Sequence, residues 1–406
     1  HADALDWKDR HYSYAFLLAA LDAWQCEFAK AGVGEGAVIA VEADFSPRAI
    51  ALMLAIIEKN CLFVPLSSSI DSKKPEFRKV AEVEFIIQID DQDRQSISRT
   101  GNQAGHEIIQ RLREKGHPGL TLFSSGSTGK SKAAVHDFVP MLEKYKVKRH
   151  SLRTITFLLF DHIGGVNTLL YNLSNAGCVV TVADRKPETV CKAIQDYGVE
   201  LLPTSPTCLN LMLVSGAHRK FDLSSLKTVT YGTEVMPEST LERFHAEFPD
   251  VRMLQTYGLS EVGILRSKSR SSDSLWVKVG GEGFDTRVVD GLLEIKAKSA
   301  MLGYLNAPSP FTDDGWFMTG DAVEVDGEYI RILGRRSELI NVGGEKVYPA
   351  EVESVIQLMG GVEEVVVNSE PHPLTGNTVV AKVKLSREES MGEYSKLLRS
   401  FYLKKM

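Results

Sequence analysis

The sequence lacks the features of a disulfide-stabilised, membrane-spanning or nucleic-acid-binding protein. Its five cysteines are odd in number and scattered, and no C-x-x-C pair occurs, so neither a disulfide framework nor a zinc cage is indicated. No apolar run approaches the roughly 18 residues of a membrane span, and no segment resembles a signal peptide. The 53 acidic residues outnumber the 47 basic ones, which argues against nucleic acid as a partner. We therefore expect a cytoplasmic protein whose partners are small molecules or other proteins.

The remaining composition is ordinary for a globular protein, with 43% hydrophobic and 25% charged residues in a chain of 406. Short apolar runs alternate with helical patterns, as in residues 37–41, 61–66 and 226–231. Ser46 is expected to cap a helix that begins at Pro47. Alternation of this kind is typical of an α/β fold with a parallel sheet covered on both faces.

The pattern changes at about Trp276, where short strands with Asp-Gly and Gly-Gly turns predict an antiparallel β region. A helix from Pro349 to Met359 and strands 362–367 and 378–385 then predict a small α+β unit. We expect a large domain over residues 1–333, a connection at 334–337 and a small domain over 338–406. Because the last residues read like the middle of a helix, we expect the small domain to be truncated.

The segment S-S-G-S-T-G-K-S-K, residues 124–132, follows directly on an apolar run. It does not match the P-loop motif, which requires a glycine where Ser124 stands. Hydroxyl groups, backbone N–H groups and lysine side chains can nevertheless hold a polyphosphate. Taken alone, the composition favours an ordinary solvated turn.

Four further motifs occur in order after this loop: Q-T-Y-G-L-S-E at 255–261, T-G-D at 319–321, G-R at 334–335 and the segment 340–353. Together the five resemble the core motifs of the adenylate-forming superfamily, which includes acyl-CoA synthetases, aryl-CoA ligases, peptide-synthetase adenylation domains and luciferases. The resemblance covers roughly residues 14–400. It implies ATP-dependent activation of a carboxylic acid to an acyl-adenylate, then thioester formation with coenzyme A and release of AMP.

The resemblance also assigns roles to residues. Those expected to contact ATP or AMP are Ser124, Ser125, Gly126, Ser127, Thr128, Gly129, Lys132, Tyr231, Gly232, Thr233, Glu234, Thr256, Tyr257, Gly258, Ser260, Asp321 and Arg335. Tyr257 matches the aromatic residue that stacks on adenine, and Asp321 the carboxylate that accepts from both ribose hydroxyls. Glu261 matches the Mg²⁺ ligand. Thr128, Lys132, Glu261 and His162 are the expected catalytic residues.

The segment 160–167 resembles the part of acyl-CoA ligases in which a histidine lines the acid pocket. The residues expected around the acid are His162, Gly164, Gly165, Tyr231, Leu259 and Gly263. The two adjacent glycines would leave room for an aryl or medium-chain acyl group. His162 is equally compatible with an ordinary core or surface histidine. Gly343 and Gly344 match the channel for the thiol, and Ser337 matches the hinge about which the small domain rotates.

One expected motif is missing, a lysine within a Pro-x-x-x-x-Gly-Lys pattern near the carboxyl end. Lys404 and Lys405 lack that context, so either the tail is absent from this chain or the protein adenylates poorly. Three alternative functions stay open. The first is an enzyme that loads an acyl carrier protein instead of coenzyme A, and the second is a protein that binds a nucleotide without turnover. The third, a P-loop NTPase, is the least favoured because of Ser124.

Overall fold

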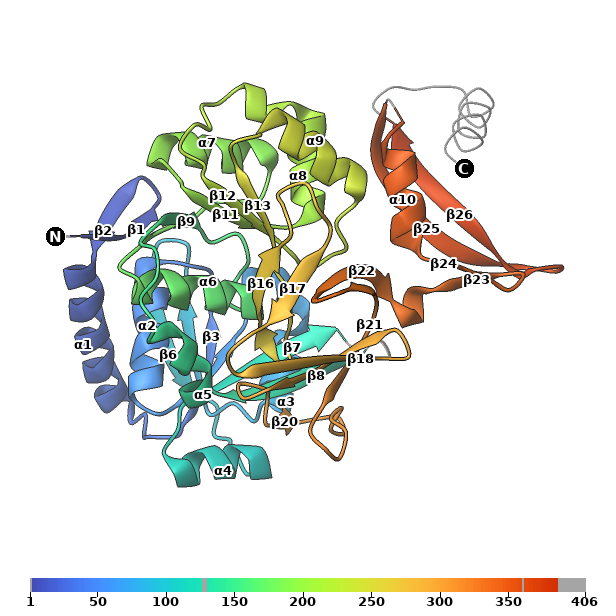
Figure 1. The fold of residues 1–406 in the computed structure, drawn as a ribbon. Helices are drawn as coiled ribbons and strands as arrows, with labels where there is room; N and C mark the ends of the chain where they lie inside the picture. Colours follow the sequence, from blue (N-terminus) through green and yellow to red (C-terminus); the bar gives the residue numbers. More distant parts are fainter. Residues whose placement is uncertain (1, 126–129, 360, 386–406) are drawn as a thin grey trace.

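The computed structural model describes residues 2–125, 130–359 and 361–385. The predicted contacts Gly126, Ser127, Thr128 and Gly129 and the lysines at 404 and 405 lie outside these residues. Figure 1 shows a large body of sheets and helices, an antiparallel β region at its lower side and a small unit at its right. The α/β class with a β region and a small α+β unit, as predicted, is confirmed.

Two seven-stranded sheets form the body. In the first, the strand order is β13-β12-β11-β9-β10-β1-β2, and every neighbouring pair is parallel except the β1–β2 hairpin. Its strands are β1 (Asp3–Trp7), β2 (Arg10–Ser13), β9 (Arg153–Ile155), β10 (Cys178–Val180), β11 (Leu201–Thr204), β12 (Thr228–Tyr231) and β13 (Arg252–Gln255).

The second sheet has the order β20-β8-β7-β4-β3-β5-β6. Its central strands β7, β4, β3 and β5 are parallel, and antiparallel strands close both edges. Its strands are β3 (Val38–Glu42), β4 (Leu62–Pro65), β5 (Phe85–Ile89), β6 (Gln95–Arg99), β7 (Gly119–Ser125), β8 (Ser131–Asp137) and β20 (Gly303–Tyr304).

Helices fill the space between the two sheets and cover their outer faces. They are α1 (Tyr14–Ala31), α2 (Pro47–Glu58), α3 (Lys74–Val80), α4 (Glu107–Lys115), α5 (Phe138–Leu142), α6 (Ile163–Ser174), α7 (Pro187–Tyr197), α8 (Pro206–Ser215), α9 (Glu238–Glu247) and α10 (Pro349–Gln357), with short 3-10 helices η1 (Ser68–Lys73), η2 (Glu143–Tyr145), η3 (Ala217–Arg219) and η4 (Arg336–Glu338). Ser46 caps α2 as expected, its Oγ accepting from Ala49 N at 3.1 Å.

The layering follows from residue alternation in the strands. In β3, Ile39 and Val41 face the core shared with α1, α2 and α6, whereas Val38 and Ala40 face the core under α3 and α4. A third core packs α7, α8 and α9 on the outer face of the first sheet. Since both faces of each central strand are buried, the strands are apolar along their whole length.

The antiparallel region is a six-stranded sheet with the order β16-β17-β22-β21-β19-β18, accompanied by the hairpin β14–β15. Its strands are β14 (Gly258–Leu259), β15 (Gly263–Ile264), β16 (Arg266–Ser269), β17 (Val277–Gly280), β18 (Phe284–Val289), β19 (Leu292–Ala297), β21 (Phe317–Asp326) and β22 (Tyr329–Arg335). The antiparallel sheet begins at Arg266, ten residues before the predicted change.

The small unit contains β23 (Ile340–Val342), β24 (Glu345–Val347), α10, β25 (Val362–His372) and β26 (Gly376–Leu385). β25 and β26 contain the two predicted strands and pair antiparallel. Hydrogen bonds from Asn210 Nδ2 to Glu363 O, at 3.4 Å, and from Thr240 Oγ1 to Gln357 Oε1, at 3.3 Å, join the unit to the body. The connection follows β22, but the domain limits and the hinge stay predictions.

Some strand limits differ from those expected. The apolar run 154–160 predicts a strand over these residues, but β9 ends at Ile155, because the chain then turns toward the start of α6. The polar stretch 90–105 contains β6, which pairs with β5 at the edge of the sheet. Edge strands carry few apolar residues, so the sequence pattern did not reveal this one. Among the described helices, none is both long and apolar enough to cross a membrane.

Candidate functional site

The segments after β12 and β13 lie side by side, because these strands are parallel neighbours with Tyr231 opposite Gln255. Thr256 N donates to Tyr231 O at 2.8 Å, and Thr256 Oγ1 donates to the same oxygen at 3.1 Å. A Cβ atom on Gly232 would lie 2.7 Å from Thr256 Oγ1. Only glycine allows this approach, so the two predicted nucleotide segments form one surface at the carboxyl edge of the sheet.

The turn that follows β12 has an unusual backbone. Thr233 adopts φ +72°, a conformation that β-branched residues rarely take, and its side chain is exposed. The neighbouring Tyr231 is buried, and its hydroxyl has no partner within the described ranges. Burial raises the pKa of Tyr231 above its usual value. Strained backbone of the kind seen at Thr233 is common at ligand-binding turns.

The side chain of Glu234 is engaged within the body. Its Oε2 accepts from Thr207 N at 3.2 Å and from Thr207 Oγ1 at 2.5 Å, in the first turn of α8. A carboxylate at a helix start satisfies free N–H groups and complements the helix dipole. Glu234 therefore fixes the turn to α8, and its contact with a nucleotide stays a prediction.

A second group forms around Glu261, which follows the β14 strand. Tyr304 Oη donates to Glu261 Oε1 at 2.6 Å, and Lys132 Nζ lies 5.3 Å from the centre of the Tyr304 ring. Burial, followed by the nearby carboxylate, raises the pKa of Tyr304, so the phenol stays protonated and donates. Tyr304 thus joins two predicted catalytic residues that are far apart in sequence.

Tyr304 was missed by sequence reasoning. It lies in the two-residue strand β20, opposite Ala134 of β8, so it reaches the hydroxyl-rich hairpin only through sheet pairing. The aromatic residue of the Gly303-Tyr304 pair was the only signal in the sequence, and such a pair is common in turns. Ser124 and Ser125 lie opposite Lys132 and Ser131 in the β7–β8 ladder. A strand rather than a helix follows the loop, consistent with the exclusion of a P-loop.

Glu261 could bind Mg²⁺ only if a substrate supplied further ligands. No group of three or more His, Cys, Asp or Glu side chains in the described part of the chain could hold a metal ion. Mg²⁺ commonly binds through one or two carboxylates, water and substrate phosphates. Glu261 fits this arrangement, since Tyr304 donates to one carboxylate oxygen and no residue in the described ranges donates to the other.

A third group contains Tyr257, Asp321 and Arg335. Tyr257 Oη donates to Asp321 Oδ2, and Arg335 Nε lies 3.5 Å from Asp321 Oδ1. Asp321 and Arg335 are opposite each other in the β21–β22 ladder. Burial raises the pKa of Asp321, an effect opposed by the Tyr257 hydrogen bond and by Arg335. The carboxylate lies largely buried beside the predicted adenine and ribose residues.

His162 has a local structural role at the start of α6. Its Nδ1 accepts from Gly164 N at 3.0 Å, so the histidine is the N-cap of the helix. Burial lowers its pKa, although Asp161 opposes the shift. The neutral ring therefore presents its Nε2 as an N–H donor. Whether it meets a substrate carboxylate stays a prediction.

The two glycines that follow His162 are explained by packing. A Cβ atom on Gly165 would lie 1.9 Å from Leu159 O, and one on Gly164 would lie 2.5 Å from Leu158 Cδ1. The positions of the missing side chains face the preceding segment of the chain. Both glycines are thus required for α6 to start beside residues 158–159, and their part in an acid pocket stays a prediction.

The remaining predicted acid residues come from the β14–β15 hairpin, in which Leu259 pairs with Gly263. His136 anchors this hairpin, with Nε2 2.5 Å from Ser260 O. Burial lowers the pKa of His136 to about 4, so it stays neutral at physiological pH. β15 also contacts α6. The structure therefore brings the hairpin and the His162 helix together.

The residues predicted to form the thiol channel lie in the small unit, not in the body. Gly343 and Gly344 form the β23–β24 turn with φ +59° and +101°, and Gly343 N donates to Thr375 O at 3.0 Å. Figure 1 shows β23 and β24 in the small unit, apart from β7 and β8. Ser337 lies exposed in η4 between the two parts.

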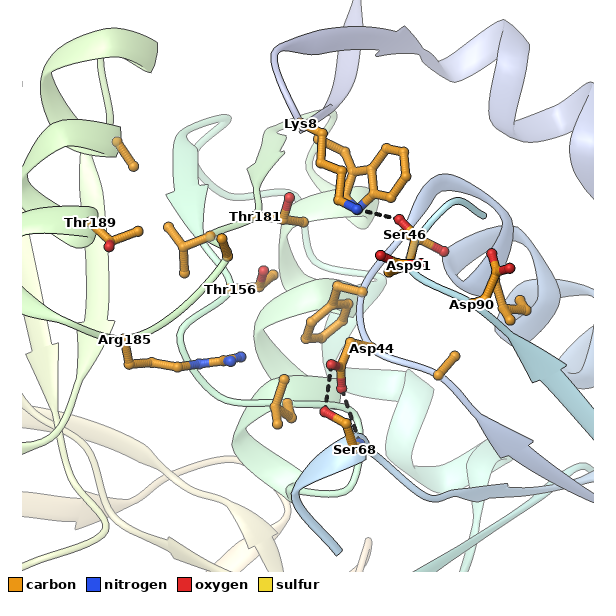
Figure 2. Close-up of a pocket in the computed structure, with 18 of the residues that line it drawn as sticks. Lys8, Asp44, Ser46, Ser68, Asp90, Asp91, Thr156, Thr181, Arg185 and Thr189 are labelled. Carbon is orange, nitrogen blue, oxygen red and sulfur yellow. Dashed lines mark hydrogen bonds between the residues drawn. The ribbon is translucent and has the colours of Figure 1, made fainter. Parts of the chain in front are cut away.

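A cavity of about 790 Å³ opens beside the ends of β3, β9 and β10, and none of the predicted site residues lines it, although its lining residue Leu159 accepts a hydrogen bond from His162 N at 3.1 Å. Figure 2 shows Arg185 extending into it and Ser68 Oγ donating to Asp44 Oδ2, at 2.8 Å. Arg185 Nε donates to Phe157 O at 3.0 Å. Carboxylate side chains outnumber basic ones in the lining, so the cavity is poorly suited to a polyphosphate.

The sequence is similar to one known protein family and to several characterised ligases. Residues 1–290 match the family described as AMP-binding enzyme. Indoleacetate–CoA ligase of Aromatoleum aromaticum is 26% identical, over 94% of this chain and 84% of its own length. A CoA ligase of Rhodococcus jostii for a methyl-dioxo-octahydroindenyl propanoate is 28% identical over 69% of this chain, which spans 59% of that relative.

Solved structures share the fold. The anthranilate CoA ligase AuaEII in complex with anthranoyl-AMP has a TM-score of 0.81 and 18% identity, covering 100% of this chain and 88% of that one. The o-succinylbenzoate CoA synthetase of Bacillus subtilis, in complex with its acyl-adenylate intermediate, has a TM-score of 0.75 and 19% identity, covering 98% and 89%.

Proposed function

Because the chain belongs to the AMP-binding enzyme family, we propose that it activates a carboxylic acid with ATP and transfers the acyl group to coenzyme A. The first half-reaction forms an acyl-adenylate and releases pyrophosphate. In the second, the thiol attacks the acyl carbon and AMP leaves. Relatives named as CoA ligases for arylacetic and larger ring-bearing acids support this reaction class.

The observation that carries the proposal is that two polar groups are built on one short segment of the chain, one around Tyr257 and the other around Glu261. Tyr257, Asp321 and Arg335 offer a buried carboxylate and a guanidinium to a nucleoside. Glu261 and Lys132 both contact Tyr304, and Lys132 belongs to the hairpin formed by β7 and β8. A nucleoside triphosphate has both a vicinal diol and a polyphosphate, and this site has donors and acceptors for each.

The chain's own residues would act mainly by positioning and by electrostatics. Asp321 would accept hydrogen bonds from the ribose hydroxyls, and Arg335 would donate to them. Lys132 would stabilise negative charge near the α-phosphate, while His162 Nε2–H would face the carboxylate of the acid. Glu261 would hold Mg²⁺, which supplies charge neutralisation on the phosphates when bound.

The proposal also includes the thiol acceptor, the class of acid and the movement of the small unit. Coenzyme A is the proposed acceptor because the relatives are CoA ligases, and a carrier-protein phosphopantetheine is the alternative. An aryl or medium-chain acyl acid is the proposed substrate class. The small unit would rotate about residues 334–337 to bring Gly343 and Gly344 to the adenylate. The cytoplasmic location stays a prediction.

The test is acid-dependent ATP–pyrophosphate exchange over a panel of aryl and alkyl acids, with release of AMP. A parallel reaction supplies a synthetic acyl-adenylate and coenzyme A, so that thioester formation is measured independently of the adenylation step. Exchange with one acid, together with thioester formation, would support the ligase. If ATP binds but neither reaction occurs with any acid, the protein is a nucleotide-binding module instead.

A further inference from the structure

Lys144 is a largely buried lysine that the proposed chemistry does not use. It lies in η2, directly after α5, and its Nζ donates to Asn167 Oδ1 at 2.6 Å and to Ile264 O at 3.3 Å. No carboxylate in the described part of the chain forms an ion pair with it. The ammonium therefore has two neutral oxygens and the face of the Tyr145 ring, whose centre lies 5.1 Å from Nζ, as partners, and one of its N–H groups donates to neither oxygen.

No anionic side chain in the described part of the chain balances the charge of Lys144. Burial, and then repulsion from Arg266, lower its pKa to about 8. The other ionisable residues of η2 are Glu143, which pairs with Lys146, and Tyr145, whose Oη donates to Asn167 Oδ1 at 2.9 Å, so neither gives Lys144 a counter-ion. A buried cation without an anion is costly, which makes an anionic ligand favourable at this point.

The position of Lys144 relates it to the proposed acid site. Asn167 is in α6, five residues after His162, or about 7.5 Å along the helix at ~1.5 Å per residue. Ile264 directly follows Gly263 in the β14–β15 hairpin. The ammonium thus bridges the two segments expected to enclose the acid, at a distance from the histidine that would face the reacting carboxylate.

We infer that Lys144 is a specificity-determining residue at the far end of the acid pocket, where it binds a second carboxylate of a dicarboxylic acid substrate. This inference rests on the proposed function. The ammonium would donate its remaining N–H to the distal carboxylate, and the side-chain amide of Asn167, whose Nδ2 donates no hydrogen bond in the described part of the chain, is available to donate a second.

The test uses paired, non-hydrolysable acyl-sulfamoyl adenosine analogues that differ only in a terminal carboxylate, such as those of heptanoic and heptanedioic acid. Their dissociation constants are measured calorimetrically on the wild type and on Lys144→Met. We expect the wild type to bind the diacid analogue about tenfold or more tightly than the monoacid analogue, as for a charge-assisted hydrogen bond. Lys144→Met should abolish this ratio, and Lys144→Arg should retain it.

Lys146→Met is the matched control, since Lys146 is exposed and pairs with Glu143. It should leave the ratio unaltered. Equal binding of both analogues to the wild type, or a diacid preference that persists in Lys144→Met, would overturn the inference and leave the proposed function standing. If neither analogue binds the wild type, the adenylate site itself is wrong, and with it both proposals.

Discussion

The hydroxyl of Tyr257 donates a hydrogen bond to the carboxylate of Asp321, a residue 64 positions further along the chain. The bond links the segment after β13 to the antiparallel sheet, and it lies next to Arg335. Burial and the nearby carboxylate keep the pKa of Tyr257 well above its usual value, so the phenol donates at every physiological pH. The bond fixes the carboxylate at the place proposed for the ribose.

Asp321→Asn should weaken nucleotide binding, since an amide oxygen and an N–H group replace two carboxylate acceptors. Loss of a hydrogen bond to a charged group amounts to about 1.5–3 kcal/mol, or roughly 10- to 100-fold in the dissociation constant of AMP. Calorimetry with AMP measures the change. An unaltered affinity would mean that Asp321 does not contact the ribose.

Tyr304→Phe should impair the reaction while preserving the packing of the ring under Lys132. The change removes the donor to Glu261 Oε1, which we expect to lower the rate of acid-dependent pyrophosphate release by about tenfold. The rate is measured over a range of Mg²⁺ concentrations. If the rate and the Mg²⁺ dependence equal those of the wild type, Tyr304 does not position Glu261.

Thr233→Gly should stabilise the protein and reduce its activity. The φ of +72° is costly for a β-branched residue, so glycine relieves about 1 kcal/mol of strain after its own entropy cost. Thermal denaturation measures the gain, and Thr233→Ala, which keeps a Cβ atom in the same conformation, should gain less. A lower unfolding temperature for the glycine variant would contradict the strain argument.

Gly165→Ala should destabilise the fold by about 1–3 kcal/mol, because the new Cβ atom would overlap Leu159 O and force the backbone to shift. Gly105→Ala is the control. Gly105 has no atom within 4 Å of the corresponding position and no positive φ, so its variant should remain within about 0.5 kcal/mol of the wild type. Urea denaturation compares the two variants, and equal effects would refute the packing explanation.

Lys144→Met should raise the stability of the protein at pH 7. The pKa of Lys144 is about 8 in the folded protein against 10.5 as its usual value, which corresponds to a cost of up to about 3 kcal/mol below pH 8. The folded state binds fewer protons than the unfolded state between these values, so stability rises with pH across that window.

This pH-dependent increment should be absent from Lys144→Met. The difference in unfolding free energy between the two proteins, measured by denaturant titration from pH 7 to pH 10, should therefore shrink as the pH rises. If the variant is instead less stable at pH 7, then Lys144 is a structural link between α6 and β15, and its hydrogen bonds outweigh its desolvation.

Much of the fold could be predicted from the sequence, because local patterns determine it. Apolar runs and helix caps, such as Ser46 before Pro47, predict parallel strands and their helices correctly. The edge strand β6 could not be predicted, since few of its side chains are buried and its pairing with β5 is a tertiary contact. The exclusion of a P-loop depended on one residue, Ser124, and the following β8 strand agrees with it.

The sequence by itself determined the fold class, the family resemblance and the order of the motifs. These depend on residue type and spacing, which the chain carries whether folded or not. Only the tertiary structure decided which side chains meet. Tyr304 beside Glu261, Tyr257 on Asp321 and Lys144 between Asn167 and Ile264 are contacts between residues distant in sequence, created by strand pairing and by the packing of α6 on β15. Contacts of this kind produce no local pattern in the sequence from which they could be predicted.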